Sequence, residues 1–261
     1  MARIFITGSS DGLGSLAAQS LVKKKHQVVL HARNQARAKD AQAACPGAET
    51  VLIADLSNPE ETKKLAEEVN KLGPFDAVIH NAGLYTGPFR KTKEGSPALF
   101  MVNTLAPYIL TCLIKPPKRL VYISSGLHTG GDESLHDLTW SERGEKRWND
   151  MRAYSDSKLH NVMFAFAFAR KWPNVASNAV DPGWVATKMG GPGAPEDINA
   201  AVDTYTMLAE GEGAAANVTG KYFKGRGIRS CKAAASDIDT QERLFKTLEE
   251  VSGVKVPQQS S

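Results

Sequence analysis

The sequence has few cysteines and no long apolar run. Only three cysteines occur in 261 residues, and their spacing fits neither a disulfide framework nor a zinc site. No apolar run reaches the length of a membrane span, and the first strand-like segment begins at residue 3, which leaves no room before it for a signal peptide. We therefore expect a soluble, cytoplasmic protein of a reducing compartment, without a metal site or a membrane contact.

The sequence also lacks a strong excess of either charge. Lys and Arg number 32 against 28 Asp and Glu, a net charge of +4, which is too balanced to indicate a nucleic-acid partner. Hydrophobic residues make up 42% and charged residues 23%, as in ordinary soluble globular proteins. The length fits one large α/β domain, so residues 1–261 are interpreted as a single domain.

Short apolar runs alternate with helix-like segments along most of the chain. This alternation predicts a single doubly wound, Rossmann-type α/β domain with a parallel sheet of about seven strands, covered by helices on both faces. The clearest predicted strands are Arg3–Ile6, Gln27–Leu30, Glu49–Ile53, Phe75–His80, Arg119–Ile123 and Val175–Val180. Two segments interrupt the alternation. Gly126–Met151 is a polar insert that carries Trp140 and Trp148, and Lys188–Ile198, rich in glycine and proline, suits a mobile lid.

A glycine-rich turn directly follows the first predicted strand. The segment reads Thr7-Gly8-Ser9-Ser10-Asp11-Gly12-Leu13-Gly14 and leads into an amphipathic helix. Glycines let the backbone approach a bulky anion, and the free N–H groups of a helix start bind phosphate, so the turn predicts a nucleotide site. Two alternatives exist. The turn could serve packing alone, or Gly8-Ser9-Ser10-Asp11-Gly12 could be the nucleophile elbow of a hydrolase, although an elbow follows several strands and none precedes residue 3.

Tyr154 and Lys158 lie four residues apart at the start of a helical segment, so they share one face of the helix. A nearby ammonium lowers the pKa of a phenol, which suits proton exchange near neutral pH. Alone, such a pair is most simply a surface pair. However, four predicted strands end in segments typical of ligand sites: Asp55-Leu56, Asn81-Ala82-Gly83, Ser124-Ser125 and Asp181-Pro182-Gly183, with Thr187 beyond the last.

In this order, the motifs resemble those of the short-chain dehydrogenase/reductase family over nearly the whole chain. The resemblance implies hydride transfer between NAD(P) and an alcohol or carbonyl compound, with Tyr154 as general acid/base. It implies that Ser125 holds the substrate oxygen, with Ser124 as the alternative, and that Lys158 binds the nicotinamide ribose and lowers the pKa of Tyr154. The implied catalytic residues are Asn103, Ser125, Tyr154 and Lys158. The implied cofactor-binding residues are Gly8, Ser9, Ser10, Asp11, Gly12, Leu13, Gly14, Arg33, Asp55, Leu56, Asn81, Ala82, Gly83, Tyr154, Lys158, Pro182, Gly183 and Thr187.

Asn103 is the family's fourth catalytic residue, and Pro107 adds a physical argument for it. Proline has no N–H, so the carbonyl of Asn103, four residues earlier, loses its helical partner. A freed carbonyl can bind water, and in the family a water at this asparagine continues the proton relay. The alternative is an ordinary polar helix residue.

The end of the second predicted strand decides the choice of cofactor. Enzymes that use NAD usually carry an acidic residue there for the ribose 2′-hydroxyl, whereas this chain has Ala32 followed by Arg33. A guanidinium suits a 2′-phosphate, so the sequence favours NADP(H) over NAD(H). The alternative is that Arg33 is simply solvated.

The insert, the segment around Tyr154 and the tail Gly220-Lys221-Tyr222-Phe223 look most like the retinol-dehydrogenase-like branch of the family. That branch acts on aldehydes, ketones and quinone-like substrates. Retinoid specificity is not implied, because many members have a membrane anchor that this chain lacks. We therefore expect NADP(H)-dependent interconversion of a carbonyl and an alcohol, with an NADP(H) sensor without turnover as the alternative.

The helix that carries Tyr154 is apolar on two faces. Lys158, Val162 and Ala165 lie on one face, and Leu159, Met163 and Phe166 lie on the other. A helix that is apolar on both faces is buried on both. The second face predicts either a homodimer interface or a surface covered by the chain's own insert, and the homodimer is favoured.

Overall fold

One mostly parallel sheet of eight strands forms the centre of the molecule. The computed structural model describes residues 1–215 and 218–258. The strand order is β3-β2-β1-β4-β5-β6-β7-β8, in which β1 to β7 run parallel and β8 pairs antiparallel with β7. The strands are β1 (Arg3–Ile6), β2 (Gln27–Ala32), β3 (Thr50–Ile53), β4 (Ala77–His80), β5 (Arg119–Ile123), β6 (Ala176–Asp181), β7 (Lys221–Lys224) and β8 (Gly227–Arg229). The predicted parallel sheet of about seven strands is confirmed, with the short β8 added at one edge.

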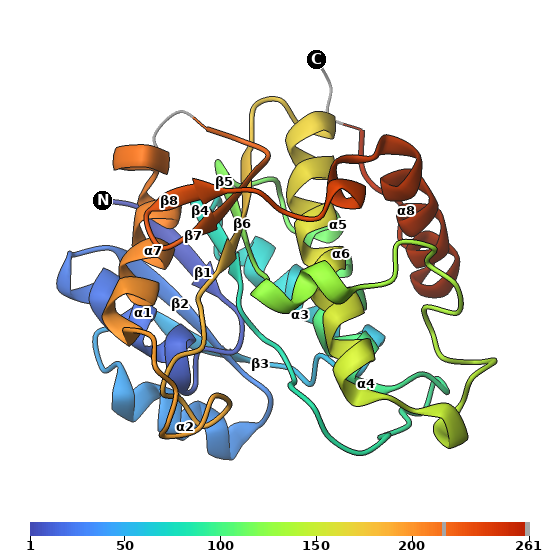
Figure 1. Ribbon diagram of the computed structural model, residues 1–261. Helices are drawn as coiled ribbons and strands as arrows, with labels where there is room; N and C mark the ends of the chain where they lie inside the picture. The colour runs from blue at the N-terminus through green and yellow to red at the C-terminus, as the bar shows by residue number, and fades with distance from the viewer. Residues whose placement is uncertain (216–217, 259–261) are drawn as a thin grey trace.

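Helices cover both faces of this sheet (Figure 1). The α-helices are α1 (Gly12–Lys23), α2 (Gln35–Ala44), α3 (Pro59–Lys71), α4 (Ala98–Phe100), α5 (Ala106–Leu113), α6 (Asp150–Lys171), α7 (Ile198–Glu210) and α8 (Ile238–Ser252). Helices α1, α2 and α7 lie on one face, α3, α5 and α6 lie on the other, and α8 packs outside α6. Shorter helical turns are the π-helix η1 (Met101–Leu105) and the 3₁₀ helices η2 (Gly126–Gly130), η3 (Glu145–Arg147), η4 (Gly213–Ala215) and η5 (Ala233–Ser236).

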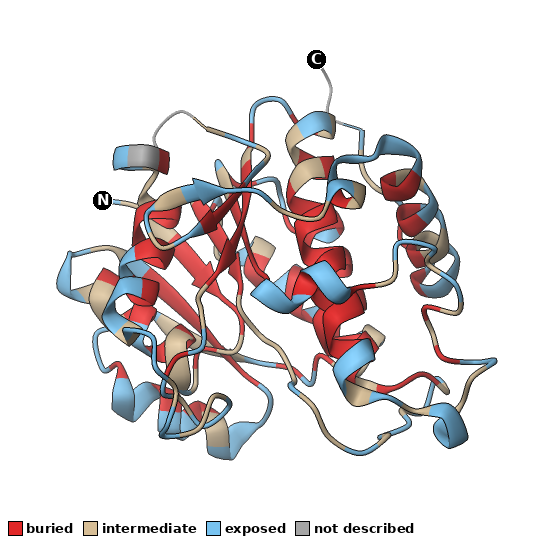
Figure 2. Ribbon diagram, in the orientation of Figure 1, coloured by how far each residue is buried: buried red, intermediate tan, exposed pale blue. Residues whose placement is uncertain are grey.

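Apolar side chains fill the two layers between the sheet and its helices. Figure 2 shows the inner strands and the inward helix faces buried, whereas the edge strands β3 and β8 are partly exposed. One aromatic cluster joins β5, α6 and α8. It consists of the rings of Tyr122 on β5, Phe164 and Phe168 on α6, and Phe245 on α8. Full burial of each such side chain contributes roughly 1.5–3 kcal/mol, so this cluster fixes α6 on the sheet. None of the helices in the described ranges is long and apolar enough to cross a membrane.

The second apolar face of α6 is covered within the chain itself. Leu159 and Met163 are fully buried, and α6 packs against η2, η5 and α8. The structure therefore supports the intramolecular cover over the homodimer that the sequence analysis favoured. Part of the predicted insert, η2, contributes to this cover, together with η5 and α8, whereas Trp140 and Trp148 of the same insert pack elsewhere. A charge at Met163 would enter the core, so Met163→Glu would test folding rather than assembly.

Four buried histidines, His31, His80, His128 and His160, make this fold sensitive to acid, because burial lowers the pKa of each. Burial lowers the pKa of His31 to about 4, and the pKa values of His80 and His160 to about 3. The unfolded chain takes up protons near pH 6.5, where the folded chain does not, so the free energy of unfolding falls as the pH drops from 6.5 towards 4.

We expect a loss of up to about 2 kcal/mol per buried histidine between pH 7 and pH 5, measured by urea unfolding at both values. His80→Asn removes one titrating ring and should flatten this dependence. His136→Gln, at a largely exposed position, should not change it. Equal stability of the unmodified chain at both pH values would contradict the prediction.

Candidate active site

A cavity of about 1260 Å³ lies where the parallel strands reach their carboxyl ends. Its walls come from the segments that follow β1, β2, β3, β4, β5 and β6, together with the start of α6. Open α/β sheets bind ligands at this edge. The volume exceeds the roughly 300–1,000 Å³ of a site for one small ligand, which leaves room for a cofactor and a substrate together.

The glycine turn between β1 and α1 packs directly against the segment after β4. A Cβ atom on Gly8 would lie 2.7 Å from the Cα of Ala82, and one on Gly14 would lie 2.4 Å from Nδ2 of Asn81. Asn81 uses this Nδ2 to donate to the carbonyls of Thr7 at 3.0 Å and Gly8 at 2.9 Å. The glycines at positions 8 and 14 are therefore required by this close approach.

Most of the predicted residues of the turn line the cavity, but two do not. Gly8, Ser10, Asp11, Gly12 and Leu13 line it. Ser9 is buried instead, where its hydroxyl donates to the carbonyl of Ile6 at 3.0 Å and accepts from the N–H of His31 at 2.9 Å. Gly14 packs on Asn81. Ser9 and Gly14 thus support the turn and do not line the cavity, and their contact with a cofactor stays a prediction.

His31 is a structural residue of the site that the sequence analysis missed. Its Nδ1 accepts the N–H of Gly8 at 2.9 Å, and its Nε2 donates to the carbonyl of Ala54 at 3.0 Å. These partners fix the neutral tautomer and join the ends of β1, β2 and β3. The sequence gives little indication of this role, because a histidine near the end of a strand has no spacing that would identify Gly8 or Ala54 as its partner.

One end of the cavity is basic. Arg33, Asp55 and Leu56 line it, as predicted, and so does Arg37, which the sequence analysis did not single out. Arg37 forms ion pairs with Asp11 and with Asp40. Its position four residues after Arg33 was the available signal. The side chain of Asp55 accepts from the N–H and the hydroxyl of Ser57, which shapes the turn after β3.

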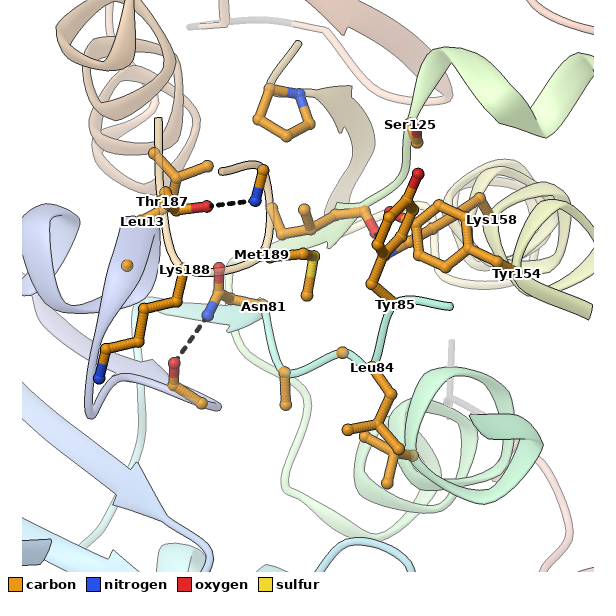
Figure 3. A pocket seen from close by; sticks show the side chains of 18 of the residues that line it. Leu13, Asn81, Leu84, Tyr85, Ser125, Tyr154, Lys158, Thr187, Lys188 and Met189 are labelled. Atoms are coloured by element: carbon orange, nitrogen blue, oxygen red, sulfur yellow. Dashed lines mark hydrogen bonds between the residues drawn. The ribbon is translucent and has the colours of Figure 1, made fainter. Parts of the chain in front are cut away.

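Tyr154, Lys158 and Ser125 meet on the opposite wall, beside Tyr85 (Figure 3). Lys158 Nζ lies 5.2 Å from the centre of the Tyr154 ring and donates to the carbonyl of Ile123 at 3.0 Å. Ser124 also lines the cavity, but its hydroxyl is buried and donates to the carbonyl of Lys158 at 2.8 Å. This engagement favours Ser125 over Ser124 as the serine that is free to hold a ligand.

Burial controls the protonation of this wall. It raises the pKa of Tyr154 above the usual value of a phenol, although a hydrogen bond with Ser125 opposes the rise. Burial also lowers the pKa of Lys158 to about 8, opposed by the charge of Asp181. Burial therefore outweighs any effect of Lys158 on the pKa of Tyr154 in the chain alone, and the lowering of this pKa by Lys158 stays a prediction. The ammonium lies over the ring and is bonded to Ile123, so desolvation of the phenolate dominates.

Asn103 lies behind the wall, within the π-helix η1. Its Oδ1 accepts from the N–H of Leu84 at 2.7 Å, and its Nδ2 donates to the carbonyl of Leu84 at 2.9 Å and to Ser157 Oγ at 3.1 Å. The carbonyl of Asn103 accepts from Asn161 Nδ2 at 3.0 Å. Pro107 has no N–H to offer this carbonyl, and the side chain of Asn161 is a partner that the sequence analysis did not foresee; the water relay stays a prediction. Asn103 is buried and does not line the cavity.

The predicted lid follows β6 and closes one side of the cavity. Pro182, Gly183 and Thr187 line it, as predicted. Thr187 Oγ1 accepts from the N–H of Gly190 at 3.1 Å. Lys188 Nζ reaches Asp11 on the glycine turn at 3.4 Å. The segment thus touches both the cavity and the turn, and its mobility stays a prediction.

The tryptophans of the insert support the wall that holds Tyr154. Trp140 and Trp148 pack at 4.7 Å between ring centres, in a cluster with Leu99, Ala153 and Tyr154. Trp148 Nε1 donates to the carbonyl of Gly87 at 2.8 Å, which holds the loop that carries Tyr85. Tyr85 stands edge-on to Tyr154, with 4.8 Å between ring centres.

Comparison with known proteins identifies the family. The short chain dehydrogenase family matches residues 2–125. The chain is 50% identical to the short-chain dehydrogenase chry4 of Gibberella zeae, over 98% of this chain and 99% of that protein. It is also 50% identical to the short-chain dehydrogenase chyC of Penicillium rubens, over 98% of this chain and all of that protein.

The chain belongs to the short-chain dehydrogenase/reductase family. It is therefore an NAD(P)-dependent oxidoreductase that acts on small molecules. Its likeness to the retinol-dehydrogenase-like branch is confirmed by human retinol dehydrogenase 14, which is 32% identical over 72% of this chain and 62% of that protein.

Solved structures share the fold of this short-chain dehydrogenase/reductase. An uncharacterised protein from Mycobacterium paratuberculosis superposes with a TM-score of 0.82 at 23% identity, over 98% of this chain and 95% of that chain. A short-chain dehydrogenase from Shigella flexneri, complexed with NADP, superposes with a TM-score of 0.64 at 23% identity, over 87% of this chain and 97% of that chain.

The contact between Gly14 and Asn81 makes a testable prediction. Gly14→Ala places a methyl group against Asn81 and against the carbonyl of Gly8, at 2.4 and 2.7 Å. Such overpacking costs about 1–3 kcal/mol of stability and displaces the turn. We expect a lower melting temperature and weaker binding of nicotinamide nucleotides by calorimetry. Gly193→Ala is the control, because its methyl group meets open space; equal behaviour of the two variants would show that the contact is unimportant.

Proposed function

We propose that this enzyme interconverts a carbonyl compound (an aldehyde, a ketone or a quinone-like compound) and an alcohol with NADP(H), and that Tyr154 is its general acid/base. The observation that carries the proposal is the meeting of Tyr154, Ser125 and Lys158 on one wall of a cavity large enough for two ligands. The opposite end of the same cavity is a glycine turn at the start of α1.

The residues of the turn fit the pyrophosphate of a dinucleotide. Helices α2, α3, α6, α7 and α8 each begin with an Asn or Asp whose side chain accepts an N–H of the first turn. Helix α1 has no such cap, because the side chain of Asp11 makes no capping bond. Its first N–H groups, at the positive end of the helix dipole, are available to an anion beside Gly8 and Gly12.

The chain's own groups suit a proton donor at the reacting centre. NADPH, when bound, supplies the hydride. Since burial raises the pKa of Tyr154, the phenol carries its proton at neutral pH and can donate it to a carbonyl oxygen held by Ser125. Lys158, anchored to Ile123, is positioned to bind the nicotinamide ribose. Asn103 does not reach the cavity itself. Its hydrogen bonds with Ser157 and Asn161 join η1 to α6, the helix that carries Tyr154 and Lys158.

The basic end of the cavity supports NADP(H) as the preferred cofactor. Arg33 lines it, and Arg37 stands one helical turn further on. Two guanidiniums match the charge and the oxygens of a 2′-phosphate better than they match a ribose hydroxyl. An NADP(H) sensor without turnover would need this end of the cavity only. The intact Ser125, Tyr154 and Lys158 favour the enzyme.

Tyr154→Phe should abolish turnover while the affinity for NADPH stays nearly unchanged. The phenol oxygen moves the proton, whereas the glycine turn, Arg33 and Lys158 hold the cofactor. Loss of a positioned proton donor costs about 10²–10⁴ in rate. NADPH consumption at 340 nm with a panel of carbonyl compounds measures the first effect, and calorimetry measures the second. Retained activity would remove Tyr154 from the mechanism.

Arg33→Ala should weaken NADPH binding far more than NADH binding. One charge-assisted contact is worth roughly 1.5–3 kcal/mol, which corresponds to about 10- to 150-fold in affinity. Arg37→Ala should act in the same direction, with a smaller effect because Asp11 and Asp40 already pair with that guanidinium. Dissociation constants for both cofactors give the answer, and equal losses for NADPH and NADH would refute the assignment of this end to the 2′-phosphate.

A further inference from the structure

A buried carboxylate, Asp181, stands in the wall of the cavity near the reacting centre. It ends β6, is 4% exposed and lines the cavity together with Ser125 and Tyr154. Its Oδ1 accepts from the N–H of Gly183 at 2.8 Å. Its Oδ2 lies 3.3 Å from the place where a Cβ on Gly126 would be, so the carboxylate is next to the residue that follows Ser125.

The charge of Asp181 is only partly compensated. Lys224 Nζ is 3.9 Å from Oδ2, beyond hydrogen-bond length, and lies closer to Glu196 Oε1, at 3.2 Å. The hydroxyl of Tyr222 is a further neighbour of this carboxylate. A carboxylate offers about four acceptor sites, and the N–H of Gly183 and the hydroxyl of Tyr222 account for only some of them. A group that enters the cavity can therefore gain by donating a hydrogen bond to Asp181.

The mouth of the same cavity is apolar. Five of the larger exposed hydrophobic side chains of the molecule gather there, from 37% exposed for Tyr85 to 59% for Trp184. They come from four separate segments, and they are Tyr85, Leu127, Met151, Trp184 and Met189. Soluble proteins rarely expose such a cluster unless it binds something. Aromatic and thioether groups in this arrangement suit a flat, apolar ligand.

We propose that the substrate of this enzyme is an apolar aromatic carbonyl compound that bears an N–H or O–H group beside the carbonyl, and that Asp181 accepts the hydrogen bond from this group. The inference rests on the proposed function and names the substrate class for the same site. In it, Ser125 and Tyr154 hold the carbonyl oxygen, Asp181 holds the neighbouring donor, and the apolar mouth holds the ring.

A purely structural role does not require the charge of Asp181. Its bond to the N–H two residues later forms a turn that asparagine makes equally well. Asp197 makes the same kind of bond to the N–H of Asn199 at 2.9 Å, but it is exposed and lies outside the cavity lining. Asp181→Asn therefore keeps the turn and removes the charge, and Asp197→Asn is its matched control.

The test compares 2′-hydroxyacetophenone with 2′-methoxyacetophenone. The first carries the donor, and the second masks it at similar size. We expect Asp181→Asn to lower the ratio of kcat/KM for the hydroxy over the methoxy ketone by about 10- to 150-fold, since a hydrogen bond to a charged group is worth roughly 1.5–3 kcal/mol. Comparing each variant with the unmodified enzyme cancels the intrinsic reactivity of the two ketones. Asp197→Asn should leave the ratio unchanged.

Binding separates this inference from the proposed function. Dissociation constants of both ketones are measured by calorimetry on the protein loaded with NADP⁺. If neither ketone nor any other carbonyl compound is reduced, the proposed function fails, while a preference for the hydroxy ketone that disappears in Asp181→Asn would still support the donor site. If both ketones are turned over and Asp181→Asn changes them equally, or not at all, the inference is overturned.

Discussion

The backbone of Gly8 is held from both sides, and the site depends on this arrangement. Its N–H donates to His31 Nδ1 at the end of β2, and its carbonyl accepts from Asn81 Nδ2 after β4. The turn between β1 and α1 is thereby tied to both neighbouring strands. A side chain at position 8 would clash with Ala82, so the turn can lie close enough for both hydrogen bonds only with glycine at this position. The position of this turn is therefore set by contacts within the chain itself.

Contacts within the chain also position the opposite wall of the cavity, which carries Ser125, Tyr154 and Lys158. Ser124, directly after β5, donates to the carbonyl of Lys158, while the aromatic cluster around Phe164 and Phe168 fixes α6 about two and three turns further on. Because α6 cannot slide, Tyr154 and Lys158 face the cavity in one geometry. The cost is desolvation, which moves the pKa of both groups away from their ordinary values. Rigidity and shifted protonation thus have one cause, the burial of α6 on both faces.

The sequence predicted what periodicity and local motifs encode, and it missed what tertiary contacts decide. The parallel sheet, the turn after β1 and the position of Tyr154 and Lys158 on one helix follow from short-range patterns. The cover of α6 does not, because α8 returns to it from more than seventy residues away. The burial of the Ser9 hydroxyl was missed for a related reason. A serine in a glycine turn resembles a phosphate ligand until its hydroxyl is seen on Ile6 and His31. Arg37 could have been suspected from its spacing to Arg33. Asp181 was identified at its strand end, but its neighbours come from distant segments.

The charges around the reacting centre indicate which half of the chemistry the free protein is prepared for. At neutral pH the raised pKa of Tyr154 keeps the phenol neutral, while Lys158, with a pKa of about 8, remains mostly cationic. The carboxylate of Asp181 favours both of these states, because negative charge opposes ionisation of a phenol and supports an ammonium. A neutral phenol is the form that gives a proton to a carbonyl oxygen, whereas oxidation of an alcohol requires the phenolate. Under the proposed function, this protonation state suits donation of a proton from Tyr154 to a carbonyl oxygen.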